Sequence, residues 1–566
     1  MPPKKRGRID RREFLKKTAR TAALAVAASS TPSLLSGCSG AGNLKYDFLI
    51  KNGTVYDGTS AEPRTADVGL KDGRIAAVGR LLDPADGGQI KEPAAGTVDA
   101  SGLIVTPGLI DVHTHCDLTF QRLGLKRYLA YFMPSWKGNH NYLYQGVTTV
   151  VTGNCGYGYT DADYWFDLVQ SVGFGTNVYH LAPHGMIREE LFGASQPGEL
   201  SASQLEAMKA RVAEEMDKGA IGLSAGLEYA PGLMASTKEI IELAKVAGKK
   251  GGLFAVHMRD ESGQAGVSGK IGLLEAIKEA IEVARRAELP VEISHLKIAR
   301  PFGSTTPAQV LDLIEKARLE GLDLTADQYP YEAGSTMVTI LLPGEFTTSV
   351  GVKEEYKTAA GRVKIKAAIE QVFAFLAPEK TLITMYPGHE EYEGKNLQEI
   401  ARMQGRSPAD AYVDMACEPE APVGVFFMME MNTVKALSGR EYIITASDGW
   451  TVPKDMTKPH PRVYGTFPRK LRRFALDDKL MPLTAAIRSM TSLPARKFKM
   501  KDRGRIEAGA VADVAVFDLK TIQDRATYQN PHQYAAGLAH LFVAGEQVVE
   551  NGRATGRRAG RPLRRA

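Results

Sequence analysis

The sequence has few cysteines and no long apolar run. Four cysteines in 566 residues cannot form the disulfide framework of a small secreted domain. No uninterrupted apolar segment reaches the length needed to cross a bilayer, which argues against a polytopic membrane protein. The composition that remains, 44% hydrophobic and 24% charged, is that of a globular chain long enough to bury more than one core.

The formal net charge of +6 is concentrated at the two ends of the chain. Residues 1–37 hold nine Lys and Arg against two acidic residues, and six arginines lie from Arg553 to Arg565. In the rest of the chain the acidic residues slightly outnumber the basic ones. Nucleic acid is therefore not the expected partner.

The first 37 residues have the pattern of an export signal. Arg11-Arg12, followed by Phe14-Leu15 and a short, weakly apolar stretch, resembles a twin-arginine signal. Leu35–Cys38, with the sequence LSGC, resembles a lipobox in which Cys38 becomes the lipidated first residue. A basic disordered tail with an incidental cysteine is the alternative. We expect export to a bacterial cell envelope or periplasm, with a lipid anchor at Cys38 holding the protein at a membrane surface.

Two separated segments have the pattern of short β-strands. Residues 46–105 alternate β-branched and apolar residues with turn pairs, and Asn52-Gly53 and Asp72-Gly73 are expected to close hairpins. Residues 504–553 have the same pattern of short strands and turns, and the basic tail 554–566 follows them. The two segments could form one small β domain, and two independent β extensions are the alternative.

Residues 106–503, between these segments, alternate strand and helix signals. Apolar residues at helical spacing separate the strand-like runs AIGLS, LFAVH, VEISH, LDLTAD and LITMY. Repeated βα units predict an α/β fold with a parallel sheet, and their number suggests a (β/α)₈ TIM-like barrel with insertions. An open doubly wound sheet is the competing fold, but the Gly-rich phosphate turn expected there does not stand out.

Polar side chains occur where the predicted strands end, which in a TIM barrel is the rim that carries the active site. The candidates are His113, His115, Cys155, His257, His295 and Asp448. His113 and His115 are two residues apart on a strand, so both imidazoles face the same side and could bind one metal ion. Each residue alone has a structural explanation, but together they favour a Zn²⁺ site over Mg²⁺ or Ca²⁺. No strand end offers an obvious lysine to bridge two metals, and Cys155 is the candidate for that position.

The motifs around these residues carry a resemblance to a known family. They are PGLIDVHTH, GVTTVVTGNCG, LSAGLEYAPG, HMRDE, ISHLK, ADQYPYEAGST, ASDG, HPRVYGTFPR and MTSLPA. In this order, from about residue 46 to 550, they resemble the N-acyl-D-amino-acid deacylases (D-aminoacylases) of the metal-dependent amidohydrolase superfamily. The resemblance implies a barrel with a small β domain assembled from the N- and C-terminal segments. It also implies one tightly held zinc on Cys155, His257 and His295. A weaker second position would be formed by four residues, His113, His115, Cys155 and Asp448.

The resemblance also implies substrate contacts. Lys297 of ISHLK and Tyr329 of YPY match residues that contact the substrate carboxylate, and Arg462 of HPR matches a third contact in part of the family. Cys116 is a departure, because an acidic or small polar residue is more usual there. It would add a thiol beside the site and raise the question of oxidation.

The expected activity is zinc-dependent hydrolysis of the amide bond of N-acyl-D-amino acids, giving a carboxylate and a free D-amino acid. Asp448 is the expected catalytic residue, first as a base toward water and then as an acid toward the leaving nitrogen. Two alternatives stay open: another amidohydrolase reaction, on a dipeptide or cyclic amide at the same metal site, and a non-catalytic metal-binding lipoprotein. The expected carboxylate contacts argue against neutral rings, and Asp448 argues against a non-catalytic protein.

Overall fold

Within the described residues, eight short parallel strands form a closed ring. They are β6 (Leu109–Asp111), β7 (Val147–Thr152), β8 continued as β9 (Asn177–His180 and Ala182–Pro183), β10 (Gly222–Gly226), β11 (Leu253–His257), β12 (Val291–Ile293), β13 (Leu324–Gln328) and β17 (Ile443–Thr445). The chain passes from β8 to β9 through Leu181, and a parallel bridge between Thr114 and Gly449 joins the ends of β6 and β17. The ring is therefore the (β/α)₈ barrel that the sequence predicts.

The computed structural model describes residues 45–81, 94–122, 137–193, 198–262, 271–299, 304–349, 351–452 and 457–565. The predicted export signal and Cys38 lie outside this range. In the described part of the chain, no helix is both long enough and apolar enough to span a bilayer.

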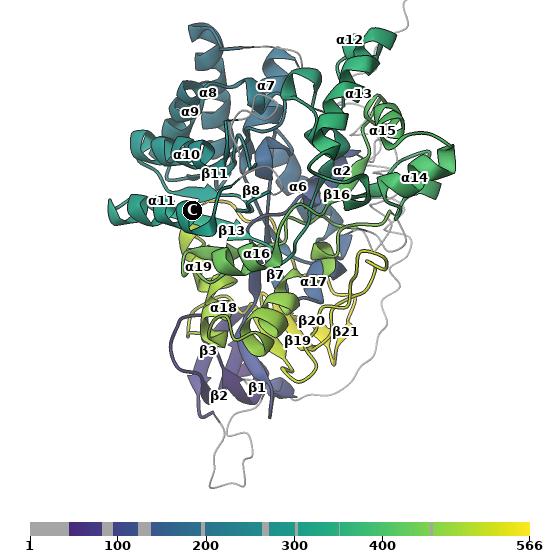
Figure 1. Cartoon of the computed structure of the whole chain (residues 1–566). Coiled ribbons are helices and arrows are strands. Elements are labelled where there is room, and N and C mark those ends of the chain that lie inside the picture. The colour runs from purple at the N-terminus through teal and green to yellow at the C-terminus, as the bar shows by residue number, and fades with distance from the viewer. Residues whose placement is uncertain are drawn as a thin grey trace, which may run out of the picture. The chain divides into compact units, whose positions relative to one another are not determined.

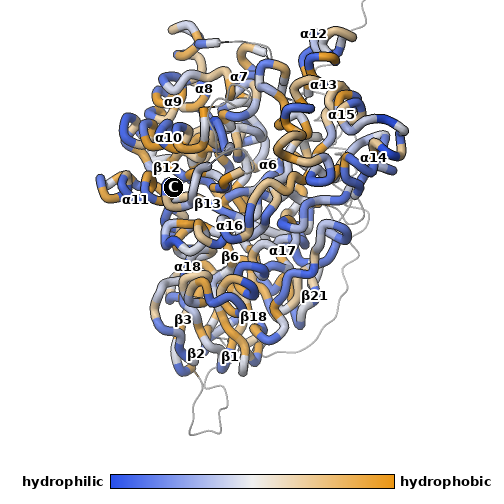
Figure 2. The backbone as a smooth tube through the Cα atoms, viewed as in Figure 1, coloured by the Kyte–Doolittle hydropathy of each residue, from blue (hydrophilic) through white to orange (hydrophobic). Residues whose placement is uncertain are grey.

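Amphipathic helices follow the barrel strands, as their periodicity predicts. The α-helices of the barrel and of the segment after it are α2 (Cys116–Arg122), α5 (His140–Leu143), α6 (Ala162–Val172), α7 (His184–Phe192), α8 (Ala202–Asp217), α9 (Thr237–Lys249), α10 (Leu273–Ala287), α11 (Pro307–Leu319), α16 (Met431–Ser438), α17 (Arg462–Arg469), α18 (Leu483–Ser489) and α19 (Ser492–Lys497). Helix α10 buries Ile277, Ile281 and Ala284 on one face. Polar and apolar residues alternate along such helices in Figure 2. The apolar faces of α8, α9, α10 and α11 pack on the strands in one large cluster, which includes Phe254 and Ile293.

Strands from both ends of the chain form one sheet. It contains β1 (Tyr46–Val55), β2 (Arg64–Lys71), β3 (Arg74–Gly79), β4 (Ala94–Asp99), β5 (Ile104–Pro107), β18 (Val514–Phe517), β19 (Leu538–Val543), β20 (Glu546–Glu550) and β21 (Arg553–Ala554). Strand β18 pairs antiparallel with β5, from Val514 opposite Pro107 to Phe517 opposite Ile104. This pairing joins the two segments into the small β domain, which lies at the bottom of Figure 1.

The two predicted hairpin turns have different outcomes. Asp72 and Gly73, with φ of 50° and 73°, connect β2 to β3, which confirms that turn. The prediction for Asn52-Gly53 is wrong, because the pair lies inside β1, where the register with β2 shifts. Asn52 has φ 62°, and a Cβ on Gly53 would lie 2.4 Å from the Val105 side chain. A pair that tolerates positive φ serves a β-bulge as well as a turn.

A long insertion separates β13 from β17. Its strands β14 (Gly334–Met337), β15 (Thr381–Met385) and β16 (Val423–Phe426) form an antiparallel sheet in the order β14-β16-β15. Its helices are α12 (Glu354–Lys357), α13 (Ala359–Phe373), α14 (Leu397–Gln404) and α15 (Pro408–Ala416). The run LITMY, which the sequence pattern assigned to the βα alternation, thus lies in the insertion, because β15 pairs with β16 and not with a barrel strand. Ile369, Tyr412 and Phe426 belong to a core cluster of the insertion itself.

The basic C-terminal segment is docked on the barrel. Gly560 and Pro562 form backbone bridges with Phe174 and Val178, near the amino-terminal ends of the strands. Leu563 packs against an apolar cluster at that end. This segment therefore braces the end of the barrel opposite to the candidate site.

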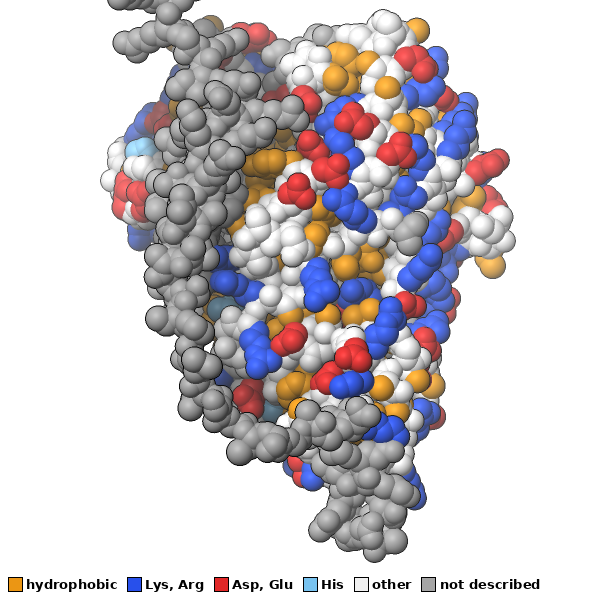
Figure 3. Space-filling model, turned by 180° about the vertical axis from the view of Figure 1, so that it is seen from behind, with side chains coloured by type: hydrophobic (Ala, Val, Ile, Leu, Met, Phe, Trp, Pro, Cys, Tyr) orange, Lys and Arg blue, Asp and Glu red, His pale blue; other side chains and the backbone are white. Residues whose placement is uncertain are grey.

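Asp513 connects the β domain to the barrel. Its carboxylate accepts hydrogen bonds from the backbone N–H of Ala544 (2.7 Å) and from Asn177 at the start of β8 (3.3 Å), and it pairs with the Arg503 guanidinium. Both charged side chains are less than 10% exposed. Over the face seen in Figure 3, by contrast, acidic and basic side chains are interspersed in solvent.

Replacing Asp513 by alanine should strongly destabilise the fold. The Arg503 charge would stay buried without its partner, which costs on the order of 3–5 kcal/mol. Glu546→Ala is the matched control, because the Arg557–Glu546 pair is more than half exposed on both sides and should contribute at most about 1 kcal/mol. Urea denaturation midpoints measure both effects. Equal shifts in the two variants would contradict the prediction.

Candidate metal and substrate site

The predicted ligand residues meet at the carboxyl ends of the barrel strands. His257 is the last residue of β11, His295 follows β12, and Asp448 follows β17. His113 and His115 follow β6, and Cys155 lies in the short 3₁₀ turn η3 (Asn154–Gly156) after β7. The structure thus places all six on the rim that the barrel prediction gives them.

Three of these residues have a left-handed backbone conformation. The φ angles are 55° for Cys155, 33° for His295 and 50° for Asp448. Such residues cost about 1–3 kcal/mol each unless their surroundings fix them. The N–H of Asp448 donates to the carbonyl of His113 (2.9 Å), and the N–H of His295 donates to the Asp327 carboxylate (2.8 Å). The surrounding barrel therefore holds the strained positions.

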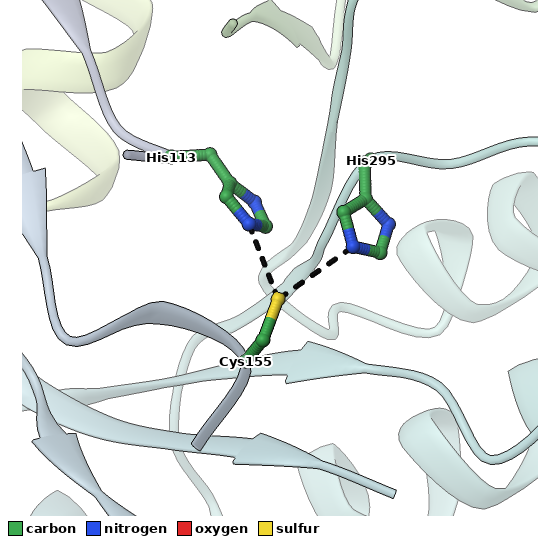
Figure 4. Close-up of side chains that lie close together, drawn as sticks. All are labelled: His113, Cys155 and His295. Atoms are coloured by element: carbon green, nitrogen blue, oxygen red, sulfur yellow. Dashed lines mark hydrogen bonds between the residues drawn. The ribbon is translucent and has the colours of Figure 1, made fainter. Parts of the chain in front are cut away.

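One potential ligand group contains the thiol. The Cys155 Sγ lies 3.3 Å from the His113 Nε2 and 3.6 Å from the His295 Nε2 (Figure 4). These three ligand atoms all lie within 4.8 Å of one another. Because imidazole nitrogen and thiolate sulfur are the ligands that zinc prefers, this group could hold such an ion.

A second group shares His113. The Asp448 Oδ1 lies 3.6 Å from the His113 Nε2 and 3.2 Å from the His115 Nε2. The two imidazoles therefore do face one side, as their spacing predicts. Two potential metal positions thus meet at His113.

His257 is arranged differently from the implied ligand set. Its Nε2 lies 3.0 Å from the Glu228 carboxylate, and its nearest ligand group joins it to Glu261 and His295 rather than to Cys155. Its Nδ1 is buried and has no hydrogen-bond partner among the described residues. Because a carboxylate on Nε2 keeps the proton there, Nδ1 retains a free lone pair. Nδ1 is therefore the ring nitrogen of His257 that remains available to a ligand.

Buried carboxylates contact the Nδ1 atoms of two of the imidazoles. The His113 Nδ1 is 3.2 Å from Asp327, and the His295 Nδ1 is 2.9 Å from Glu261. A carboxylate on Nδ1 fixes the tautomer of His113 and aims its Nε2 at the centre, whereas the His295 Nδ1 also lies 2.8 Å from the Lys297 Nζ. Asp327, Glu261 and Glu228 were not predicted from the sequence. Glu261 lies four residues after His257 and Glu228 two residues after β10, so a search for acids near strand ends could have found them.

The electrostatics of the site favour neutral imidazoles and an ionised Asp448. Burial lowers the pKa of His113 to about 3, and burial together with Lys297 lowers that of His295 to about 3. Burial alone would raise the pKa of Asp448, but the Arg462 charge and the hydrogen bond from His115 outweigh it and hold that pKa well below its usual range. Burial and the Asp448 charge raise the pKa of the Cys155 thiol well above its ordinary value, so the thiolate needs a cation beside it.

The predicted substrate contacts surround this cluster. The Arg462 Nη2 lies 2.9 Å from the Asp448 Oδ2, and the guanidinium stacks on the Tyr329 ring at 4.5 Å. The Nε and Nη1 of Arg462 and the hydroxyl of Tyr329 are buried and have no hydrogen-bond partner within the described part of the chain. Unpaired buried donors are costly, so a carboxylate ligand there would be stabilising. Lys297 differs, because its Nζ lies 2.6 Å from both Glu261 oxygens.

Two cavities open onto the cluster. Both are lined by Tyr229, His257, His295, Ser335, Thr336 and Asp448. One also contains Lys297 and Tyr329, and the other contains Cys155 and Arg462. A bound molecule could therefore extend to both sides of the ligand cluster.

Cys116 does not add a reactive thiol to this cluster. It begins α2 and is buried in a core cluster with Phe120 and Tyr142. Burial raises the pKa of its thiol to about 12. Because oxidation proceeds through an accessible thiolate, the departure from the family pattern does not make the site sensitive through this residue.

A barrel with imidazole, thiol and carboxylate ligands at its strand ends defines a metal-dependent hydrolase. The chain belongs to the amidohydrolase family, which residues 96–549 match. It is 33% identical to a D-aminoacylase of Alcaligenes xylosoxydans xylosoxydans, over 92% of this chain and 98% of that protein. It is 34% identical to an N-acyl-D-glutamate deacylase of the same organism, over 92% and 97%.

A solved structure of a related deacylase is also similar to this chain. The crystal structure of N-acyl-D-glutamate deacylase from Bordetella bronchiseptica, complexed with zinc and a phosphonate mimic of the tetrahedral intermediate, has a TM-score of 0.76 to this chain. It is 30% identical and covers 92% of this chain and 100% of that one. The resemblance drawn from the motifs is confirmed, as is the barrel with its small β domain.

Replacing Cys155 by alanine should remove tightly held metal. The wild-type protein should retain about one zinc per chain after purification, and the variant should lose it because the thiolate ligand is gone. Cys417→Ala is the matched control, since Cys417 is half-buried and packs against the insertion core. Mass-spectrometric metal analysis measures the content. Full zinc content in the Cys155 variant would exclude Cys155 as a ligand.

Proposed function

We propose that this protein hydrolyses the amide bond of N-acyl-D-amino acids and releases a carboxylate and a free D-amino acid. The observation that carries the proposal is a metal-ligand cluster beside buried, unpaired carboxylate-binding donors on Arg462 and Tyr329. The similarity to a D-aminoacylase and an N-acyl-D-glutamate deacylase over almost the whole chain supports it.

Zinc is the metal that we propose for this site. Cys155, His257 and His295 would hold the tight ion, with His257 offering its Nδ1. A weaker second position would use four residues, His113, His115, Cys155 and Asp448. When bound, zinc polarises the amide carbonyl and lowers the pKa of the attacking water.

Asp448 is the residue that we propose transfers a proton from the attacking water to the leaving nitrogen. Its carboxylate is ionised and buried, and it lies beside His115 and Arg462. It would take the proton of the attacking water and pass it to the departing nitrogen. Its strained backbone, fixed by the bond to the His113 carbonyl, keeps the carboxylate on the ligand side of the barrel mouth.

Arg462 and Tyr329 would bind the α-carboxylate. The free Nε–H and Nη1–H of Arg462 can donate to a carboxylate, and the Tyr329 hydroxyl lies on the ring that stacks on the same guanidinium. Lys297 lines the same cavity as Tyr329, with its ammonium paired to Glu261. Fixing the carboxylate orients the amide at the cluster and selects amino-acid derivatives.

A substrate panel tests this function. The purified protein should cleave N-acetyl-D-amino acids and leave the L-forms and carboxylate-free amides largely intact. With the α-carboxylate and the scissile amide both held in place, only one configuration at the α-carbon fits, and an amide without the carboxylate loses one of the two contacts. Asp448→Asn should keep its zinc yet turn over at least about a hundredfold more slowly. The exposed Asp312→Asn is its control. Equal cleavage of L-forms or amides would favour another amidohydrolase reaction, on dipeptides or cyclic amides, at the same site.

We also propose that the protein is exported and anchored by lipid at Cys38. The support is the order of Arg11-Arg12, the weakly apolar stretch and the LSGC sequence. Cys38→Ser should move the protein from the membrane to the soluble envelope fraction without loss of hydrolysis, as cell fractionation would measure. A wild-type chain that keeps Met1 and stays in the cytosol would refute the anchor.

A further inference from the structure

His460 links the helix that carries Arg462 to the loop that carries Tyr329. It lies two residues before Arg462, the first residue of α17, and each of its two ring nitrogens has a partner. The backbone N–H of Arg462 donates to the His460 Nδ1 (2.9 Å). The His460 Nε2 lies 2.9 Å from the carbonyl oxygen of Ala333, in the loop that follows β13. One imidazole thus joins two segments that are 127 residues apart in the chain.

These two contacts fix the proton of the imidazole. Because the His460 Nδ1 accepts an N–H, it carries the lone pair, and the proton is on Nε2, which donates to the Ala333 carbonyl. The ring is buried and packs edge-on against Tyr331 and Tyr528, with centroids 5.2 and 5.1 Å away. Burial and the Arg462 charge hold the pKa of His460 well below its usual range. The ring therefore stays neutral and keeps both hydrogen bonds at neutral pH.

The start of α17 depends on this imidazole. The first N–H groups of a helix have no partner within the helix, and a serine, threonine, aspartate or asparagine just before the helix usually accepts one of them. In α17 the preceding residue is Pro461, whose side chain has no acceptor, and the His460 Nδ1 accepts the Arg462 N–H instead. The position of the Arg462 backbone is therefore set by a side chain outside the helix.

A further contact holds the same loop against α17. The Arg462 Nη2 donates to the Ser335 carbonyl (3.3 Å), two residues after the one that His460 contacts. Tyr329 begins this loop, directly after β13, and the Arg462 guanidinium lies over its ring. The contacts of His460 on the helix and on the loop thus hold Arg462 and Tyr329 at a fixed position relative to each other.

We infer that His460 is a positioning residue for the substrate: it holds the Arg462 backbone so that the free guanidinium donors and the Tyr329 hydroxyl reach one carboxylate. The inference rests on the proposed function, in which these two residues bind the α-carboxylate. His460 itself transfers no proton, since both of its ring nitrogens are engaged. The carboxylate is held in the ground state and the transition state alike, so a loss of alignment should appear in KM more than in kcat.

Three replacements of His460 separate its two hydrogen bonds. Asparagine can place its amide oxygen where Nδ1 lies and keep the Arg462 contact, glutamine can place its amide nitrogen near Nε2 and keep the Ala333 contact, and alanine keeps neither. His460→Ala should raise the KM for the best N-acetyl-D-amino acid of the wild-type panel at least about tenfold. Its kcat should change less than about threefold. His460→Asn should recover more of the loss than His460→Gln, because the Arg462 N–H is the bond that sets the guanidinium.

A double variant tests whether the effect passes through Arg462. Arg462→Lys keeps a charge beside Asp448 but lacks the free Nε and Nη1 donors. In that background His460→Ala should change KM by less than about twofold, since no guanidinium is left to misplace. A further tenfold rise there, or a His460→Ala single variant with the wild-type KM, overturns the inference.

His540→Ala is the matched control. His540 is also buried and accepts a hydrogen bond at Nδ1, from the Gln547 amide (3.0 Å), but it lies on β19 in the small β domain, so KM should not change. An equal rise in KM in this control would overturn the inference, because the effect would then be a general one.

Circular dichroism and zinc content establish that each variant is folded and loaded. If His460→Ala does not fold, the other two replacements decide: a larger rise in KM for His460→Gln than for His460→Asn supports the inference, and an equal or reversed order overturns it. A wild-type protein that cleaves no N-acetyl-D-amino acid would instead overturn the proposed function, before any variant is compared.

Discussion

Asp327 is the constraint on which the arrangement of the ligand cluster depends. It belongs to β13, and its carboxylate accepts the backbone N–H of His295 and lies 3.2 Å from the His113 Nδ1. Asp327 therefore fixes both the strained backbone of His295 after β12 and the ring orientation of His113 after β6. A carboxylate in the barrel interior is costly unless it is hydrogen-bonded. Asp327 therefore depends on His113 and His295 for hydrogen bonds, and the two histidines depend on Asp327 for their positions. The barrel closes around this shared acceptor.

The rest of the fold supports that rim from different directions. At the opposite end, the C-terminal segment packs Leu563 against the apolar cluster, and the β18–β5 pairing ties the β domain together across the sequence. On the rim side, the insertion has its own core and lines part of both cavities. Stability and chemistry are thus separated, as is general for barrel enzymes.

The sequence predicted what depends on local pattern. The His113–His115 spacing, the strand-end positions of His257 and Asp448 and the helical periodicities all follow from strand and helix geometry. The partners of these residues could not be predicted in the same way. Asp327, Glu261 and Glu228 each look like an ordinary acid in the sequence, and only the closed barrel shows which imidazole each one faces. The β15 error has a similar cause, since a five-residue apolar run has the same pattern in a parallel or an antiparallel sheet.

The thiol at Cys155 couples metal loading to the electrostatics of the whole site. Asp448, Glu261 and Asp327 all disfavour a thiolate there, and burial adds to their effect. A cation held by Cys155 and the imidazoles would reverse this balance, because it would stabilise the thiolate as well as the carboxylates around it. Metal binding would therefore favour loss of the thiol proton and offset the mutual repulsion of the buried anions. For a protein that we propose to be exported by a twin-arginine signal, which carries folded chains, this coupling favours metal binding before export, when the ligand cluster first assembles.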